Sequence, residues 1–184
     1  MESKEIARRC IEFDGPPRIA RHFHVSPIDG WTCPVTDFAG IAYGTASNFV
    51  PSEQGMTEWG YAMESFDPTG QDMGQVKHPP LADWSDYDSY HFPDFSRRER
   101  YAHLEKIVAE HHSNGLYVYG PIPSLMLLPI NLRGIENGFL DHALNVAELE
   151  SLLDRIVEAR LAIIDAYHRA GADADAHGRD GRPG

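Results

Sequence analysis

The second half of this 184-residue chain alternates helix-patterned segments with a short apolar segment. Residues 96–113 begin with a Ser-x-x-Glu capping box and repeat apolar residues every three or four positions, which predicts a helix that ends at Asn114-Gly115. Residues 116–119 predict a short buried strand, and residues 145–170 predict a long amphipathic helix. Strands and helices in alternation are typical of right-handed βαβ units, so we predict an α/β fold with a parallel sheet. The apolar stripe of the long helix is formed by Val146, Leu149, Leu152, Leu153, Ile156, Val157, Ile163, Ile164 and Tyr167.

The first half of the chain gives weaker patterns. Residues 2–13 predict a short amphipathic helix, and apolar segments at residues 18–25, 38–43 and 57–63 predict strands. Residues 78–95 fit neither a helical nor a strand period, and they combine acidic with aromatic side chains. Long loops of this kind are usually functional or packed on themselves. The aromatic residues are therefore predicted either to cover a ligand or to pack against the fold.

The segment after the long helix lacks the pattern of a further strand. A buried parallel strand is rich in Val and Ile, whereas residues 172–184 contain neither and end in Gly, Pro and charged residues. Two helical pieces, at residues 124–128 and 134–144, precede the long helix. We therefore predict one domain over residues 1–173, followed by a disordered or truncated tail over residues 174–184.

Composition argues against several classes of partner. The formal net charge is −12, which disfavours nucleic acid and anionic membrane surfaces because both attract clustered Lys and Arg. The two cysteines, Cys10 and Cys33, lack the density and spacing of a disulfide framework or a zinc site. The charged N-terminus has no apolar signal-peptide core, and no segment reaches the roughly 20 apolar residues of a membrane span. These features predict a cytoplasmic protein.

Three groups of residues resemble one known family in their order and spacing. They are residues 10–21; residues 57–61, 74–84 and 92–94; and residues 120–126, 132–137, 141 and 171–173. The third group is the most specific, and it contains Gly-Pro-Ile-Pro-Ser-Leu-Met and Leu-Arg-Gly-Ile-Glu-Asn. On these residues the chain resembles the N-terminal half of the uroporphyrinogen decarboxylase superfamily. That superfamily also contains methyltransferases that move methyl groups to and from corrinoid cofactors.

The resemblance implies an eight-stranded β/α barrel of roughly twice this length, with its site on the loops after the carboxyl ends of the strands. This chain would then form a partial TIM-type barrel, about the first half. The implied substrate is tetrapyrrole- or corrinoid-linked, met as a small molecule or on a corrinoid protein. No cofactor is expected in the chain as given, whereas corrinoid and zinc are implied for a full-length relative of the methyltransferase type.

The resemblance is weaker at the functional residues of the decarboxylase itself. The family's substrate-binding arginine after the first strand corresponds to Val25, and a tyrosine near its pocket corresponds to Leu128. An essential aspartate falls near Glu58, at the end of a predicted strand, so a carboxylate is kept there. These matches favour methyl transfer over decarboxylation, with Glu58 as the acid/base or anchoring carboxylate. The alternative for Glu58 is an exposed or salt-bridged side chain.

Four further residues are candidates for substrate binding. Arg133 and Glu136 stand one turn apart on a predicted helix, where they would support the site or form an ion pair that braces the helix. His24 alternates with His22 on the first predicted strand, so both face one side, as ligands or as partly buried, hydrogen-bonded residues. Trp84 belongs to the aromatic loop and would stack on a flat tetrapyrrole or pack against the fold.

Two functions from different classes follow. The first is an enzyme of the superfamily that acts on a tetrapyrrole- or corrinoid-linked substrate. The second is a non-catalytic fragment from a truncated reading frame, or one partner of a split barrel. A half barrel leaves unpaired strand edges, which predicts a homodimer or a complementary half-barrel as the partner. At the end of the pattern, Asp173 and Asp175 would either hold a metal or begin a frayed tail.

Overall fold

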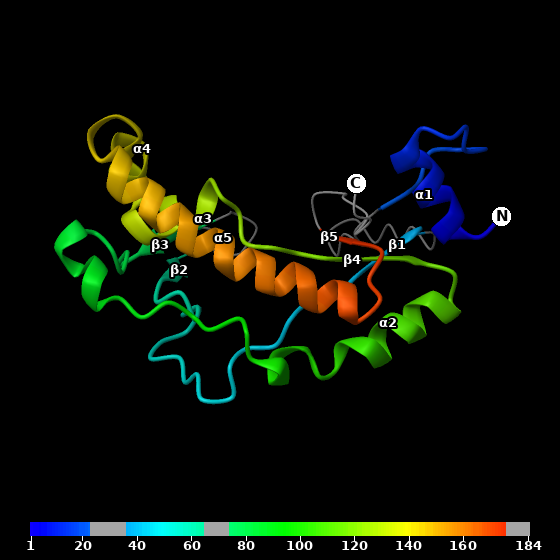
Figure 1. Cartoon of the computed structure of the whole chain (residues 1–184), viewed down its shortest axis with the longest axis horizontal. Helices are drawn as coiled ribbons and strands as arrows, with labels where there is room; N and C mark the ends of the chain where they lie inside the picture. The colour runs from blue at the N-terminus through cyan, green and yellow to red at the C-terminus, as the bar shows by residue number, and fades with distance from the viewer. Residues whose placement is uncertain (23–35, 65–73, 176–184) are drawn as a thin grey trace. The chain divides into compact units, whose positions relative to one another are not determined.

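The structure is a computed structural model of the chain, and it describes residues 1–22, 36–64 and 74–175. Helices alternate with short strands, so the chain is α/β, as the sequence predicts (Figure 1). The helices are α1 (Ser3–Glu12), α2 (Leu104–Ser113), α3 (Leu127–Arg133), α4 (Ile135–Leu144) and α5 (Val146–Arg169), with 3₁₀ helices at Trp84–Ser89 and Arg98–Tyr101. The strands are β1 (Phe38–Gly40), β2 (Ala62–Glu64), β3 (Gln75–Lys77), β4 (Tyr117–Gly120) and β5 (Ala174–Asp175).

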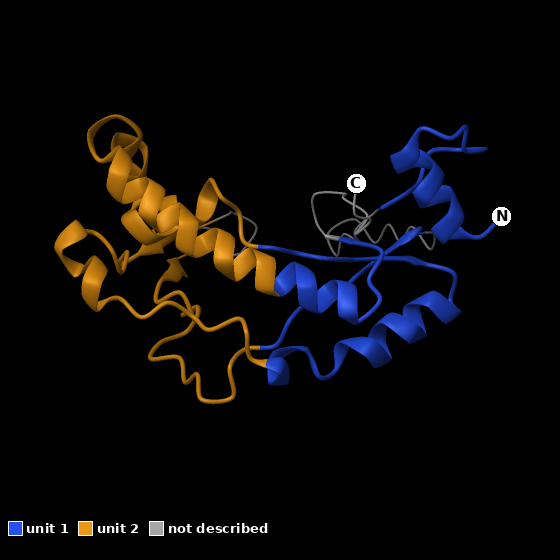
Figure 2. Cartoon of the chain, in the orientation of Figure 1, with its two compact units in different colours: residues 1–44, 98–122, 163–184 blue, residues 45–97, 123–162 orange. Residues whose placement is uncertain are grey.

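The chain forms two compact units, each assembled from separate segments. Unit 1 comprises residues 1–44, 98–122 and 163–184, and unit 2 comprises residues 45–97 and 123–162 (Figure 2). Along the chain, the first segment of unit 2 follows β1 and the second follows β4. The single domain over residues 1–173 stays a prediction, and within these residues the structure separates the two compact units.

Unit 1 is built on parallel strands in the order β1, β4, β5. Phe38 pairs with Tyr117 across the first interface, and Tyr119 pairs with Ala174 across the second. The central strand β4 buries Tyr117 and Val118, as expected for a strand with neighbours on both edges. Neighbouring parallel strands in chain order, with helices in their connections, confirm the predicted βαβ arrangement. The described strands form an open sheet, and no closed barrel is seen among them.

Strand β5 begins where the sequence predicts a tail. The backbone N–H of Asp173 donates to the carbonyl oxygen of Val118 at 2.8 Å, and Ala174 then pairs with Tyr119. Ala174 is buried against Tyr117, so a small side chain takes the place of the expected Val or Ile. Residues 176–184, the rest of the predicted tail, lie outside the described residues.

Unit 2 combines an antiparallel pair, β2 and β3, with α3, α4 and residues 146–162 of α5. Gly134 separates α3 from α4 and has a φ of 84°, a conformation that glycine adopts without strain. The helical piece predicted at residues 134–144 appears as α4, whereas the piece predicted at residues 124–128 is displaced, since α3 begins only at Leu127 and continues to Arg133. The core of this unit is formed by Trp59, Leu81, Phe95, Leu128, Leu132, Leu149, Leu152 and Ile156.

Helix α5 confirms the long helix that the sequence predicts. The buried residues of its stripe include Leu149, Leu152, Ile156 and Tyr167, whereas Val146 is exposed. Gly171, with a φ of 84°, follows its end. Within the part of the chain that the structure describes, no helix combines the length and the apolar character needed to cross a membrane.

The predicted strands of the first half are shorter or displaced. Residues 18–22 belong to no helix or strand, and residues 23–25 lie outside the described ranges. The strand predicted over residues 38–43 is reduced to β1. The strand predicted over residues 57–63 starts only at Ala62, because residues 57–60 form a turn in which the N–H of Gly60 donates to the carbonyl of Thr57.

The helix predicted over residues 96–113 is interrupted. It consists of a 3₁₀ helix at Arg98–Tyr101 followed by α2. Ser96, the predicted cap, lies two positions before this 3₁₀ helix, and its own N–H and Oγ both donate to Asp94 Oδ1, at 2.9 and 2.6 Å. Asp94 thus accepts the hydrogen bonds at the start of this segment.

Candidate functional site

Two predicted substrate-binding residues, Arg133 and Trp84, come together in unit 2 around Asp141, a position of the family resemblance to which the sequence assigned no role. Arg133 Nε donates to Asp141 Oδ2 at 2.6 Å, and Trp84 Nε1 donates to Asp141 Oδ1 at 3.1 Å. The guanidinium carbon of Arg133 lies 4.0 Å from the centre of the Trp84 ring, a cation–π contact. Asn145 Nδ2 also donates to Asp141, and Arg133 Nη1 donates to the carbonyl of Leu81. We call Trp84, Arg133, Asp141 and Asn145 the Asp141 cluster.

The Asp141 cluster is closed to solvent at its centre. The side chains of Arg133 and Asp141 are 4% and 1% exposed. Burial by itself raises the pKa of Asp141, but hydrogen bonds from Arg133, Asn145 and Trp84 outweigh it and hold that pKa below its usual value. Asp141 is therefore ionised, and its partners occupy the groups of Arg133 and Trp84 that would otherwise bind a ligand. This geometry favours the bracing interpretation of Arg133 and the packing interpretation of Trp84.

Glu136 lies apart from this ion pair. Arg133 ends α3 and Glu136 stands in the first turn of α4, with the bend at Gly134 between them. The two residues are therefore not one turn apart on a single helix, and the predicted i,i+3 pair is replaced by the pair of Arg133 with Asp141. Glu136 is exposed on α4.

Glu58 lies in the turn before β2 rather than at the end of a strand. Its side chain is half-buried, and Oε1 accepts a hydrogen bond from the backbone N–H of Ala46 at 2.9 Å. The chain therefore holds this carboxylate in place through a backbone contact. The position still belongs to the connection between β1 and α2, which leaves the carboxyl end of a parallel strand.

Of the paired histidines, only His22 can be placed. His24 lies outside the described residues. His22 Nε2 is 3.0 Å from the hydroxyl of Tyr119, and its ring packs edge-on against Phe38 and Tyr119. Its hydrogen-bonded, aromatic surroundings agree with a structural histidine.

A pocket of about 270 Å³ lies in unit 2, between residues 92–96 and α5. Trp59 and Phe95 stack at its wall with ring centres 5.6 Å apart. The guanidinium carbon of Arg155 lies 5.2 Å from the centre of the Phe92 ring. The pocket thus combines aromatic faces with a cation, and the sequence patterns did not identify it because its residues come from three separate segments. Its lining comprises Trp59, Phe92, Pro93, Asp94, Phe95, Ser96, Arg155, Glu158, Ala159 and Ala162.

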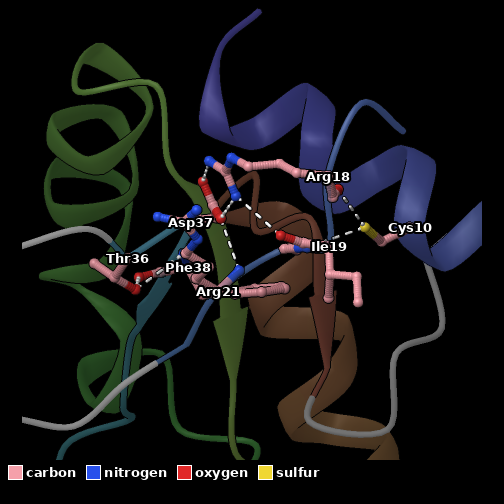
Figure 3. A network of polar contacts seen from close by, with 8 residues as sticks. Cys10, Arg18, Ile19, Arg21, Thr36, Asp37 and Phe38 are labelled. Atoms are coloured by element: carbon pink, nitrogen blue, oxygen red, sulfur yellow. Dashed lines mark hydrogen bonds and ion pairs between the residues drawn. The ribbon is translucent and has the colours of Figure 1, made fainter. Parts of the chain in front are cut away.

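Unit 1 contains a buried carboxylate, Asp37, that the sequence patterns did not indicate; Figure 3 shows it with its polar contacts. Asp37 is fully buried and immediately precedes β1. Arg18 Nη1 and Nη2 donate to Asp37 Oδ2 and Oδ1 at 2.6 and 2.7 Å. The backbone N–H of Arg21 also donates to Oδ2, at 2.7 Å. In the same view the Cys10 thiol meets the backbone of this segment, where it accepts from the N–H of Ala20 at 3.2 Å. Asp37 therefore anchors residues 18–21 beside β1.

Asp37 makes stability depend on pH. The hydrogen bonds from Arg18 lower the pKa of Asp37 well below its usual value, although burial opposes them. Because the pKa of Asp37 is lower in the folded state than in the unfolded state, ionised Asp37 stabilises the fold at any pH above its unfolded-state pKa of about 3.9. This stabilisation is lost as the pH falls through the folded-state pKa. We expect the free energy of unfolding to fall between about pH 5 and pH 2 in urea titrations. Asp37→Asn should lower it by about 2 kcal/mol at pH 7 and flatten that dependence; an equally steep curve in the variant would contradict this role.

Asp173 holds a second polar cluster in unit 1. Lys4 Nζ lies 2.6 Å from Asp173 Oδ1, and His112 Nε2 lies 2.8 Å from Oδ2. The backbone N–H of Val118 donates to the same Oδ2 at 2.9 Å. Asp173 thus joins α1, α2 and β4, rather than opening a frayed tail. Like Asp37, it lies at the amino end of a parallel strand, the end that serves stability rather than catalysis in β/α barrels.

The described residues do not fit a zinc site. Among residues 1–22, 36–64 and 74–175, no group of three or more His, Cys, Asp or Glu side chains is arranged to hold a metal ion. Comparison of the chain with protein-family models, with curated proteins and with solved structures found no match. The function proposed below is therefore supported by the chain's own residues.

Proposed function

We propose that this chain forms the first part of a β/α barrel of the uroporphyrinogen decarboxylase type and acts on a tetrapyrrole- or corrinoid-linked substrate. One observation carries the proposal: both segments of unit 2 leave the carboxyl ends of adjacent parallel strands, β1 and β4. In β/α folds the connections at this end bear the functional groups. Glu58 belongs to the first connection, and Glu136 belongs to the second, together with Arg133 in its bracing role.

The chemistry of the pocket in unit 2 supports the same class of substrate. Trp59 and Phe95 offer flat apolar faces, and Arg155 stands at the Phe92 ring as a cation. Arg155 is also paired with Glu158, but both side chains are half-exposed, so a carboxylate on the ligand could compete for the guanidinium. A flat ring that bears a carboxylate, such as one pyrrole of a tetrapyrrole, fits these walls. A volume of about 270 Å³ suits one such ring rather than a whole macrocycle.

Methyl transfer is the reaction that we favour, with decarboxylation second. Leu128, which corresponds to a pocket tyrosine of the decarboxylase, is buried in α3 and offers no hydroxyl. Glu58 would be the acid/base or the carboxylate that anchors a protonated group of the substrate. No step is assigned to zinc, since the described residues lack its ligands.

Replacing Glu58 tests the proposal. Gln keeps an oxygen that can accept from the N–H of Ala46 but removes the charge, so the fold should be retained. We expect the purified chain to demethylate methylcobalamin in the presence of a thiol acceptor, and Glu58→Gln to slow this at least tenfold. The absorbance change of the corrinoid measures the rate, and carbon dioxide release from uroporphyrinogen measures the alternative reaction.

A matched variant controls for charge. Glu53→Gln removes an exposed carboxylate five positions before Glu58, and the ion-pair partner of Glu53, Lys77 Nζ, lies 4.0 Å from its Oε2. It should leave the rate unchanged, because a pair of this kind contributes little. Failure of the chain to turn over either substrate would reject the proposed activity. An equal loss in both variants would remove Glu58 from the site.

A further inference from the structure

The apolar stripe of α5 is interrupted where the helix borders the pocket of unit 2. Ile156 and Ile163 are buried two turns apart, and the turn between them should carry a further large apolar residue on the same side. The two positions that fit this period hold Ala159, which lines the pocket, and Arg160, whose guanidinium donates to a backbone carbonyl. Ala162 lines the pocket as well. We call Ala159 and Ala162 the pocket alanines.

The aromatic wall of the pocket is held in place by its own contacts. Trp59 and Phe95 stack on each other and are only 6% and 3% exposed. The Phe92 ring meets the Tyr90 ring edge-on with centres 4.7 Å apart, and the Tyr90 hydroxyl donates to the carbonyl of Trp59 at 2.7 Å. These rings are fixed, so they do not fill the space beside the pocket alanines. Atoms that line such a space lack contact partners, which a ligand would supply.

We propose that the pocket alanines determine which ligands enter: a single planar ring lies on them, with its carboxylate at Arg155. This role rests on the proposed function of the pocket, but it does not depend on the reaction. Arg155 stands one turn before Ala159 on the same side of α5, so the cation borders the apolar floor. Its guanidinium carbon lies 5.2 Å from the centre of the Phe92 ring. A larger residue at either alanine would occupy the place of the ligand's ring.

The two carboxylates that line the pocket have partners of their own. Asp94 Oδ1 accepts from the N–H and Oγ of Ser96, and Oδ2 accepts from Arg97 Nε at 3.3 Å. Glu158 is paired with Arg155, and both side chains are exposed, so the pair contributes little to stability. An anionic ring therefore displaces only Glu158 from Arg155, whereas a neutral ring gains nothing from this exchange. The preference of the pocket for a carboxylate should depend on Arg155.

The test is the binding of pyrrole-2-carboxylate to the full chain, followed by the NMR signals of the ligand. We expect a dissociation constant on the order of 1 mM, because the ligand is small. Ala159→Leu and Ala162→Leu should each raise it about tenfold or more. Neither should lower the midpoint of thermal unfolding, because each added side chain fills empty space. Ala147→Leu is the matched control, since it makes the same change at an exposed position of α5 in unit 2, and it should leave the constant within about twofold.

A second ligand tests the contact with Arg155. The wild-type chain should bind pyrrole-2-carboxamide about threefold or more weakly than the carboxylate, and Arg155→Gln should abolish this difference. Equal binding of the two ligands by the wild-type chain would overturn the proposal, as would no binding of the carboxylate up to about 20 mM.

The leucine variants give the remaining outcomes. Unchanged binding in both Ala159→Leu and Ala162→Leu, or equal weakening by Ala147→Leu, would overturn the role of the pocket alanines. Circular dichroism shows whether each variant keeps its helix content, and a variant that fails this check is replaced by the Val substitution at the same position. The expected binding in a chain that turns over neither methylcobalamin nor uroporphyrinogen would reject the proposed activity alone. Turnover without this binding would reject the role of the pocket alanines alone.

Discussion

Asp141→Ala is expected to lower the free energy of unfolding by about 3–5 kcal/mol. The change would leave the Arg133 guanidinium buried without its carboxylate, and an uncompensated buried charge is costly. It would also deprive Trp84 Nε1 and Asn145 Nδ2 of the oxygen to which both donate. Denaturant titration followed by tryptophan fluorescence measures the change, because the Trp84 ring lies directly under Arg133.

Two further variants distinguish the loss of the Arg133–Asp141 ion pair from the general effect of an Asp→Ala change on the free energy of unfolding. Asp154→Ala removes an exposed carboxylate from α5 of the same unit and should cost less than about 0.5 kcal/mol. The double variant Arg133→Met with Asp141→Leu should be more stable than Asp141→Ala alone, because no buried charge is left unpaired. A cost below about 1 kcal/mol for Asp141→Ala would show that the pair is open to water in solution.

The elements that the sequence predicted best are those whose stability is encoded locally. The stripe of α5 repeats over many turns, and its buried members Leu152, Ile156 and Tyr167 are those that the period indicates. Strand β4 was found because Tyr117 and Val118 form an apolar segment bounded by glycines. Strands β2 and β3 were missed or displaced, because three-residue strands such as Ala62–Glu64 carry too few alternating positions to give a period.

The polar sites were harder to predict because their partners are distant in sequence. The pairing of Arg133 with Glu136 assumed one continuous helix, and Gly134 interrupts it. The glycine itself was the available signal, since glycine often marks a helix end. Nothing in a helical or strand period joins Arg18 to Asp37, or Lys4 to Asp173. These ion pairs exist because the fold brings segments together, so tertiary packing had to be known first.

The residues of the candidate site were difficult to predict for the same reason, because they too are distant from one another in sequence. Glu58 was selected by its correspondence with a family position, and the structure places it in a turn fastened to Ala46. The residues that line the pocket, Trp59, Phe95 and Arg155 among them, come from three parts of the chain. The aromatic content of residues 78–95 did not distinguish a loop that covers a ligand from a loop that packs against the fold. The hydrogen bond of Tyr90 to the carbonyl of Trp59, at 2.7 Å, and that of Trp84 to Asp141 favour the packed segment.

Gly120→Ala is expected to lower the free energy of unfolding by about 3 kcal/mol or more. Gly120 ends β4, and a Cβ at this position would lie 2.6 Å from Tyr167 Cδ2 and closer still to the ring atoms Cζ and Cε2. Tyr167 cannot easily move away, because its ring is buried and its hydroxyl donates to the carbonyl of Pro121 at 3.1 Å. The added methyl group must therefore displace either a core aromatic ring or the central strand of the unit 1 sheet.

Gly40→Ala is the matched control for this prediction. Gly40 ends the neighbouring strand β1, and its Cβ would meet the Tyr119 hydroxyl oxygen at 3.5 Å, an ordinary contact. Urea titrations should therefore show a change of no more than about 1 kcal/mol for Gly40→Ala. Tyr167→Leu should reduce the cost of Gly120→Ala when the two are combined, since the smaller side chain relieves the overlap. If Gly120→Ala cost no more than Gly40→Ala, Tyr167 would not pack against the end of β4, and the close approach that holds α5 to the sheet of unit 1 would have to be abandoned.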